Sequence, residues 1–167
     1  MKKEGVLPVY NSVDLYFDHG DGVYLYTEDG TRYLDFTSGI GVTCLGHSHP
    51  ALVSALREQA GKLWHCSNLF KIKGQETVAK KIVDHSFASN VFFCNSGAEA
   101  VEAGIKAVRK YFYLNKKNKY KIICVNNAFH GRTLGAISAA GQDKLLEGFD
   151  PRLDGFEHVD FNNLEAI

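Results

Sequence analysis

Two short segments carry the kinds of residue that bind anions and flat rings. The first is Asn95-Ser96-Gly97-Ala98-Glu99, in which small residues lead directly into a predicted helix. The first N–H groups of a helix lack internal partners and lie at the positive end of its dipole, so they can bind a phosphate. Gly97 would let the phosphate approach closely. Ser96 and Glu99 also match a capping box, in which Ser96 accepts a first-turn N–H and Glu99 bonds back to the cap. The pattern leaves both interpretations open.

The second segment runs from Asn126 to Thr133 and places an aromatic ring, an imidazole and a guanidinium in one loop. Phe129 can offer a flat face to a ring, and Arg132 can bind a carboxylate through two parallel hydrogen bonds. Taken singly, Phe129 is better explained as a core residue and Arg132 as a surface ion-pair partner. Together with a phosphate site, they favour a flat, phosphorylated ligand and an anionic co-substrate. For His130, a structural role is favoured over catalysis.

The elements before these segments predict that both lie at one edge of a sheet. Val91–Cys94 and Ile122–Val125 are short apolar runs, typical of strands that are covered on both faces of a parallel sheet. Between them, Val101, Ile105 and Val108 fall on one helical stripe. The order predicts a right-handed strand–helix–strand unit, and ligands of such sheets bind beyond the carboxyl ends of the strands.

The N-terminal part predicts a β-hairpin followed by two helices. Val23–Tyr26 and Tyr33–Phe36 are β-prone and are separated by a turn. A helix should then begin near Pro50 and end near Trp64, and a second helix should cover Gln75–His85.

Composition excludes several classes of protein. The chain has 167 residues, with 19 Lys and Arg against 19 Asp and Glu, and this neutral balance argues against nucleic-acid binding. His47 and His49 have no third metal ligand nearby, which favours a structural role for both. The spacing of the four cysteines is typical of reduced, mostly buried thiols in a cytoplasmic protein without a metal site. These are Cys44, Cys66, Cys94 and Cys124.

Taken in order along nearly the whole chain, a set of motifs resembles the N-terminal part of the class III aminotransferases, which depend on pyridoxal 5'-phosphate (PLP). The matching stretches are Gly22-Val23-Tyr24-Leu25, Tyr33-Leu34-Asp35-Phe36, Gly39-Ile40-Gly41-Val42, Gly46-His47-Ser48-His49-Pro50, Leu63-Trp64-His65, Ser67-Asn68-Leu69-Phe70, Asn95-Ser96-Gly97-Ala98-Glu99-Ala100 and Ala128-Phe129-His130-Gly131-Arg132-Thr133-Leu134-Gly135.

The resemblance implies an α/β fold, the N-terminal part of a fold-type I PLP-dependent transferase, with a mostly parallel sheet, flanking helices and a preceding β-hairpin of the small domain. Residues 1–65 would belong to the small domain and the interface, and residues 66–167 to the first part of the large PLP-binding domain. Gly97 and Ala98 match the positions that bind the cofactor phosphate, with Ser96 beside them. Phe129 matches the aromatic residue that stacks on the pyridine ring, and Arg132 the residue that binds a carboxylate of the acylated substrate.

Within the class, the motifs are most similar to those of enzymes that move the δ-amino group of N2-acetylornithine to 2-oxoglutarate in arginine biosynthesis, as cytoplasmic homodimers. Relatives that use ornithine, succinyl-diaminopimelate or 4-aminobutyrate are alternatives, as is a non-catalytic chain that binds a phosphorylated ligand. The lysine that forms the Schiff base with the cofactor is expected beyond Ile167, so the chain itself should hold no catalytic residue and should be inactive. Asn162–Ile167 resembles the unclosed start of a helix, and we expect a truncated chain with apolar faces left uncovered.

Overall fold

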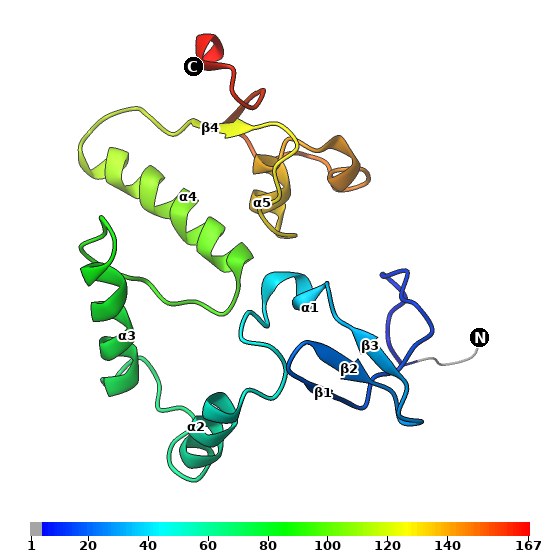
Figure 1. Cartoon of the computed structure of the whole chain (residues 1–167). Helices are drawn as coiled ribbons and strands as arrows, with labels where there is room; N and C mark the ends of the chain where they lie inside the picture. The colour runs from blue at the N-terminus through cyan, green and yellow to red at the C-terminus, as the bar shows by residue number, and fades with distance from the viewer. Residues whose placement is uncertain (1–4) are drawn as a thin grey trace. The chain divides into compact units, whose positions relative to one another are not determined.

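A computed structural model describes residues 5–167, which form two compact units, one ending at Ile72 and the other beginning at Lys73 (Figure 1). The first unit is a small antiparallel sheet followed by a loop and a helix. The second unit is an α/β arrangement of helices with a parallel strand pair. Within residues 5–167, no helix combines the length and the apolar character needed to cross a bilayer.

The sheet of the first unit has three short antiparallel strands, β1 (His19–Asp21), β2 (Tyr24–Tyr26) and β3 (Arg32–Leu34). Strands β2 and β3 confirm the predicted hairpin, and Leu25 of the middle strand lies opposite both Gly20 and Tyr33. Strand β1 was not predicted, because its three residues show no apolar alternation.

A glycine-rich loop (residues 35–49) and helix α2 follow this sheet. The short α1 (Ser38–Gly41) contains left-handed backbone angles and is better described as a turn. Helix α2 (Pro50–Ala60) begins with its proline at the first helical position, as predicted. It ends four residues before Trp64, where Gly61 interrupts the helix and the indole Nε1 donates to the Ala60 carbonyl at 2.7 Å.

The second unit begins with α3 (Lys73–Asp84), close to its predicted bounds, and continues with the long helix α4 (Gly97–Leu114). Strand β4 (Ile122–Val125), helix α5 (Leu134–Ala139), the turn η1 (Asp143–Leu145), strand β5 (Phe156–Val159) and the turn η2 (Leu164–Ala166) follow. Strands β4 and β5 are parallel and in register from Ile122–Phe156 to Val125–Val159. The unit thus has the predicted α/β character, although its last residues form a single 3-10 turn.

The prediction of a strand at Val91–Cys94 is wrong for this structure. These residues are extended but unpaired, and Phe92 is 74% exposed. A strand requires a hydrogen-bonded neighbour, and β4 pairs with β5 instead. The strand–helix–strand unit therefore consists of β4, α5 and β5, whereas the prediction combined Val91–Cys94, α4 and β4.

Helix α5 is the centre of the core in the second unit, and Gly135 to Ala140 are buried. Ser138 is buried among them, and its hydroxyl donates to the Leu134 carbonyl at 2.7 Å and accepts the Leu153 N–H at 3.0 Å. The first of these bonds is internal to α5, and the second ties the helix to the segment before β5.

Large apolar surfaces are exposed, as expected from the sequence. The chain exposes 14677 Å², whereas a folded protein of this mass exposes about 8,200 Å², and two separate domains of half the mass about 9,900 Å² together. The same exposure contradicts the prediction of mostly buried cysteines. Only Cys124 is buried among the four, and burial raises the pKa of its thiol. Cys44 and Cys94 are exposed, and Cys66 is partly exposed.

Candidate cofactor-binding site

The beginning of helix α4 forms the first half of the candidate site. Ser96 is the N-cap, and its hydroxyl accepts the Glu99 N–H at 3.2 Å. The carboxylate of Glu99 accepts the N–H of Asn95 at 2.7 Å, one residue before the position expected for a capping box. Ser96 therefore caps the helix, but the Glu99 carboxylate bonds the N–H of Asn95 and not that of Ser96.

This cap leaves the next two amides available. Among residues 5–167, no acceptor bonds the N–H of Gly97 or Ala98, and both amides belong to the first turn of an 18-residue helix. A Cβ atom added to Gly97 would meet no atom within 4 Å, so the space beside this glycine is open. Two unpartnered donors, a helix dipole and open space fit the binding of a phosphate group. Capping and phosphate binding are compatible here, because they use different N–H groups.

The loop after β4 forms the second half of the site. It begins with a turn at Asn126 and Asn127 and then crosses the start of α4 at Gly131. A Cβ atom on Gly131 would lie 2.6 Å from the Cβ atom of Ala98, and its φ of 117° is a conformation that side chains disfavour. Glycine is therefore required at this contact, which brings the two predicted segments together.

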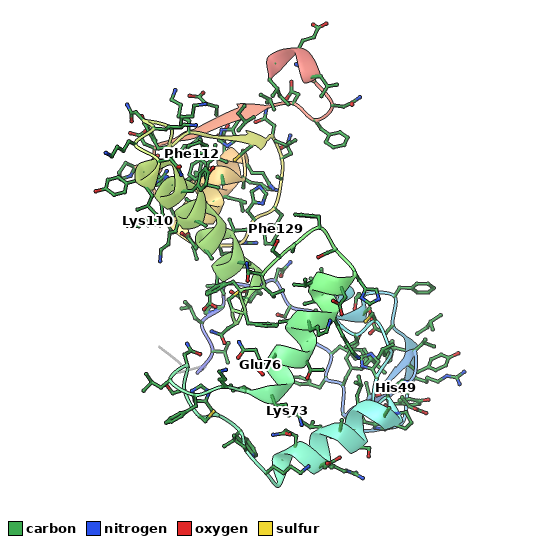
Figure 2. The ribbon with its side chains drawn as sticks, turned by 90° about the vertical axis from the view of Figure 1, so that its left-hand side faces the viewer. His49, Lys73, Glu76, Lys110, Phe112 and Phe129 are labelled. Atoms are coloured by element: carbon green, nitrogen blue, oxygen red, sulfur yellow. The ribbon has the colours of Figure 1, made fainter. Side chains whose placement is uncertain are left out.

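Phe129 and Arg132 lie on this loop beside the start of α4, where Figure 2 labels Phe129. The Phe129 ring is 67% exposed, and the Arg132 guanidinium carbon lies 5.8 Å from its centroid. This distance is within the range of cation–π contacts. Neither residue is in the core, and within residues 5–167 no carboxylate pairs with Arg132. Both side chains are thus available to a ligand.

His130 lies elsewhere. It lines a groove of about 780 Å³ between α4 and β4, together with apolar residues such as Ile105 and Ile123. Ser96, Gly97, Phe129 and Arg132 do not line this groove. The imidazole thus borders a groove that the predicted anion-site residues do not line, and the structural role of His130 stays a prediction.

Two residues that hold the site together were missed by sequence reasoning. Thr133, the N-cap of α5, donates its hydroxyl hydrogen to the carboxylate of Glu102 on α4 at 2.5 Å. The two residues are 31 positions apart, and no local pattern links them. The Ser/Thr preference at N-caps could have identified Thr133 as a cap, but not its partner.

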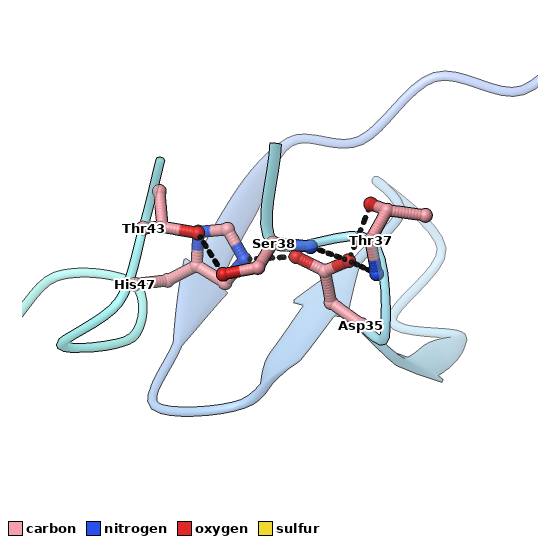
Figure 3. A network of polar contacts seen from close by, with 5 residues as sticks. All are labelled: Asp35, Thr37, Ser38, Thr43 and His47. Carbon is pink, nitrogen blue, oxygen red and sulfur yellow. Dashed lines mark hydrogen bonds and ion pairs between the residues drawn. The ribbon is translucent and has the colours of Figure 1, made fainter. Parts of the chain in front are cut away.

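In the first unit, a separate polar network holds the glycine-rich loop (Figure 3). One oxygen of Asp35 accepts the Thr37 hydroxyl at 2.7 Å and the N–H groups of Thr37 and Ser38, both at 2.9 Å. The other oxygen accepts Nε2 of His47 at 2.8 Å, and the hydroxyls of Ser38 and Thr43 lie 3.0 Å apart. The Thr37 hydroxyl, followed by the His47 ring, lowers the pKa of Asp35 well below its ordinary value of 3.8. His47 thus has a structural role.

The chain belongs to the class III aminotransferases, since the model of that family, "Aminotransferase class-III", matches residues 8–167. Among similar proteins, the acetylornithine aminotransferase of Agrobacterium fabrum is 48% identical over 98% of this chain and 42% of its own length. Acetylornithine aminotransferase 1 of Bradyrhizobium diazoefficiens is 52% identical over 97% of this chain and 40% of its own length. The chain therefore spans about two fifths of these relatives.

Solved structures of the same class share the fold. The ornithine aminotransferase of Toxoplasma gondii has a TM-score of 0.90 at 29% identity, over 98% of this chain and 39% of that one. The adenosylmethionine-8-amino-7-oxononanoate aminotransferase of Methanocaldococcus jannaschii has a TM-score of 0.83 at 35% identity, over 89% of this chain and 35% of that one. These matches define the fold as part of a PLP-dependent class III aminotransferase. PLP is the cofactor of this family.

Proposed function

We propose that this chain is the phosphate- and ring-binding part of an aminotransferase that moves the δ-amino group of N2-acetylornithine to 2-oxoglutarate. The identity of 48–52% to acetylornithine aminotransferases supports this choice of amino donor over ornithine. The carrying observation is the contact of Gly131 with Ala98, because it joins an open helix start to a loop with an exposed ring and a free guanidinium. A phosphate, an aromatic ring and a carboxylate can then be bound side by side.

Each predicted residue has a separate task in this proposal. The amides of Gly97 and Ala98 donate to the cofactor phosphate, while Ser96 fixes the turn through its bond to the Glu99 N–H. The Phe129 ring stacks on the pyridine ring, and Arg132 binds a substrate carboxylate. PLP, when bound, supplies the electron sink for amino-group transfer. The residues of this chain bind and orient both molecules but do not move the proton.

The remaining parts of the proposal concern the complete protein. We assign residues 1–65 to the small domain and the dimer interface, and residues 66–167 to the large domain. The amine that binds the cofactor belongs to the part of the complete protein outside this chain, and the exposed apolar faces are covered by that part or by the second subunit of a homodimer. Arginine synthesis in the cytoplasm is the corresponding biological role.

An assay of the complete protein tests the function. We expect glutamate to form from acetylornithine and 2-oxoglutarate, with a higher kcat/KM for acetylornithine than for ornithine, succinyl-diaminopimelate or 4-aminobutyrate. A preference for one of these other donors would overturn the substrate assignment. The purified 167-residue chain, assayed in parallel, should form no glutamate, and measurable turnover would contradict the proposed location of the catalytic amine.

A further inference from the structure

Arg132 lies between two residues that are both fixed to helix α4. On one side, Gly131 contacts Ala98 so closely that a Cβ atom would approach to 2.6 Å. On the other side, the Thr133 hydroxyl donates to Glu102 at 2.5 Å. Ala98 and Glu102 are four residues apart and therefore lie on the same face of α4, one turn from each other. The backbone on either side of Arg132 is thus tied to one helical face.

The Thr133 hydroxyl both donates and accepts a hydrogen bond. Its hydrogen is donated to Glu102, and its oxygen accepts the Ala136 N–H at 3.2 Å as the cap of helix α5. Helix α5 is in turn buried in the core. Glu102 therefore connects α4, the Arg132 loop and the most buried helix of the unit through a single hydroxyl group.

Gly135 provides the space for the Glu102 carboxylate. A Cβ atom on Gly135 would lie 2.5 Å from Oε1 of Glu102 and 3.0 Å from Oε2. The backbone of Gly135 is helical and has no left-handed angle, so a side chain at residue 135 would conflict only with the position of the Glu102 carboxylate, which would have to move. Three separate observations, at Gly131, Thr133 and Gly135, thus converge on the same arrangement.

We propose that Glu102 is a positioning residue that acts through Thr133 to hold Arg132 where it binds the substrate carboxylate. This inference rests on the proposed function of Arg132. Glu102 does not pair with Arg132 itself, since its Oε1 atom accepts the Thr133 hydroxyl and no ion pair of Arg132 occurs within residues 5–167. The guanidinium charge therefore stays available, while its backbone is held in place.

Two substitutions remove the link without removing Glu102. Thr133→Val deletes the hydroxyl at constant shape, and Gly135→Ala adds a methyl group that displaces the carboxylate. Thr133→Ser retains the hydroxyl and should behave as wild type. Matched controls are Thr77→Val, whose hydroxyl bonds only within α3, and Gly104→Ala, where a Cβ atom meets nothing within 4 Å.

The experiment uses the complete protein with bound PLP and the non-reactive probe N2-acetylnorvaline, which has the substrate carboxylate but no δ-amine. Calorimetry should show about three- to tenfold weaker binding of the probe to Thr133→Val and Gly135→Ala, the usual effect of one lost hydrogen bond. KM for acetylornithine should rise similarly with kcat nearly unchanged, whereas KM for a primary amine donor without a carboxylate should not change. Hydrogen exchange over residues 129–135 should accelerate in the same two variants.

Wild-type probe affinity in Thr133→Val and Gly135→Ala would overturn the positioning role. A loss of PLP affinity as large as the loss of probe affinity in these variants would also overturn it. Unchanged hydrogen exchange over residues 129–135 would show that the Thr133–Glu102 bond does not hold this loop, whatever the values of KM and probe affinity. A wild-type protein that binds neither PLP nor the probe would instead refute the proposed function, and it would remove the positioning role with it. The two failures are therefore distinguishable.

Discussion

Two loops of this chain each follow a strand, yet they are held in different ways. The loop after β3 is fixed mainly by Asp35, whose carboxylate accepts bonds from the residues two and three positions ahead and from His47. The loop after β4 is fixed by Gly131 against Ala98 and by Thr133 against Glu102, contacts that span 33 and 31 residues. The first loop has several donors on one acceptor. In the second loop the start is held by the N–H groups of Asn127 and Ala128, whereas the residues on either side of Arg132 are tied to α4 by one contact each.

This difference predicts unequal tolerance to substitution. The residues around Arg132 are tied to α4 by one glycine contact and one hydroxyl, so their position should change when either is altered. A carboxylate with four donors should retain most of its function when one donor is lost. These two contacts lie directly beside Arg132, so small changes at residues 131 and 133 should affect ligand binding most.

The largest effect is expected for Gly131→Ala. The new Cβ atom would lie 2.6 Å from that of Ala98, at a φ of 117°. Overpacking and backbone strain together should lower the free energy of unfolding by about 2–4 kcal/mol. Urea unfolding of the complete protein measures this, with Gly104→Ala as the control. A variant as stable as wild type would show that Gly131 does not pack closely against Ala98 of α4.

Gly97→Val should weaken PLP binding at least about tenfold, or about 1.4 kcal/mol, while leaving the apoprotein stable. A Cβ atom at residue 97 meets no atom of this chain within 4 Å, so the expected loss of affinity comes from crowding of the phosphate. Gly74→Val is the matched control, because Gly74 also lies in the first turn of a helix and a Cβ atom there also meets nothing within 4 Å. An absorbance titration with PLP distinguishes the two variants, and equal affinity would refute the phosphate site.

Asp35→Asn should destabilise the first loop in a pH-dependent way. The pKa of Asp35 is lowered by its donors in the folded state, so its contribution to stability is fully present above its unfolded value of 3.8. That contribution is lost as the pH falls below 3.8 towards the folded pKa. The difference in urea midpoint between wild type and variant should thus be constant from pH 7 to about pH 5 and shrink below about pH 4.

Asp21→Asn is the control for this measurement, since no side-chain bond of Asp21 occurs within residues 5–167. A midpoint difference for Asp35→Asn that persists undiminished at pH 3 would show that the carboxylate charge is not what holds the loop.

The smallest effect is expected for Thr37→Val. Asp35 would keep His47 and the N–H groups of Thr37 and Ser38 after the hydroxyl is lost. Hydrogen exchange over residues 37–46 should change about twofold or less, clearly less than the effect of Thr133→Val on residues 129–135. Equal acceleration of both loops would contradict the contrast between them.

Local patterns were sufficient for the elements whose stabilising partners are close in sequence. The hairpin of β2 and β3, the start of α2 at Pro50 and the cap at Ser96 all depend on residues within a few positions, and the structure confirms them. The strand expected at Val91–Cys94 failed, because an apolar run becomes a strand only beside a partner, and the run does not encode one.

The candidate site followed the same rule. Ser96, Gly97, Phe129 and Arg132 could be selected by residue type and by their place after apolar runs. Glu102 could not, because a glutamate in the middle of an amphipathic helix is ordinarily a solvated side chain. Its role depends on the approach of α5 to α4, which tertiary packing determines.

A crystal structure of the complete protein with bound PLP tests the central claim most directly. We predict that the cofactor phosphate accepts hydrogen bonds from the amides of Gly97 and Ala98, at about 2.7–3.2 Å, with the Phe129 ring stacked on the pyridine ring. A phosphate bound away from the start of α4, with these two amides bonded to water or to protein, would contradict the account.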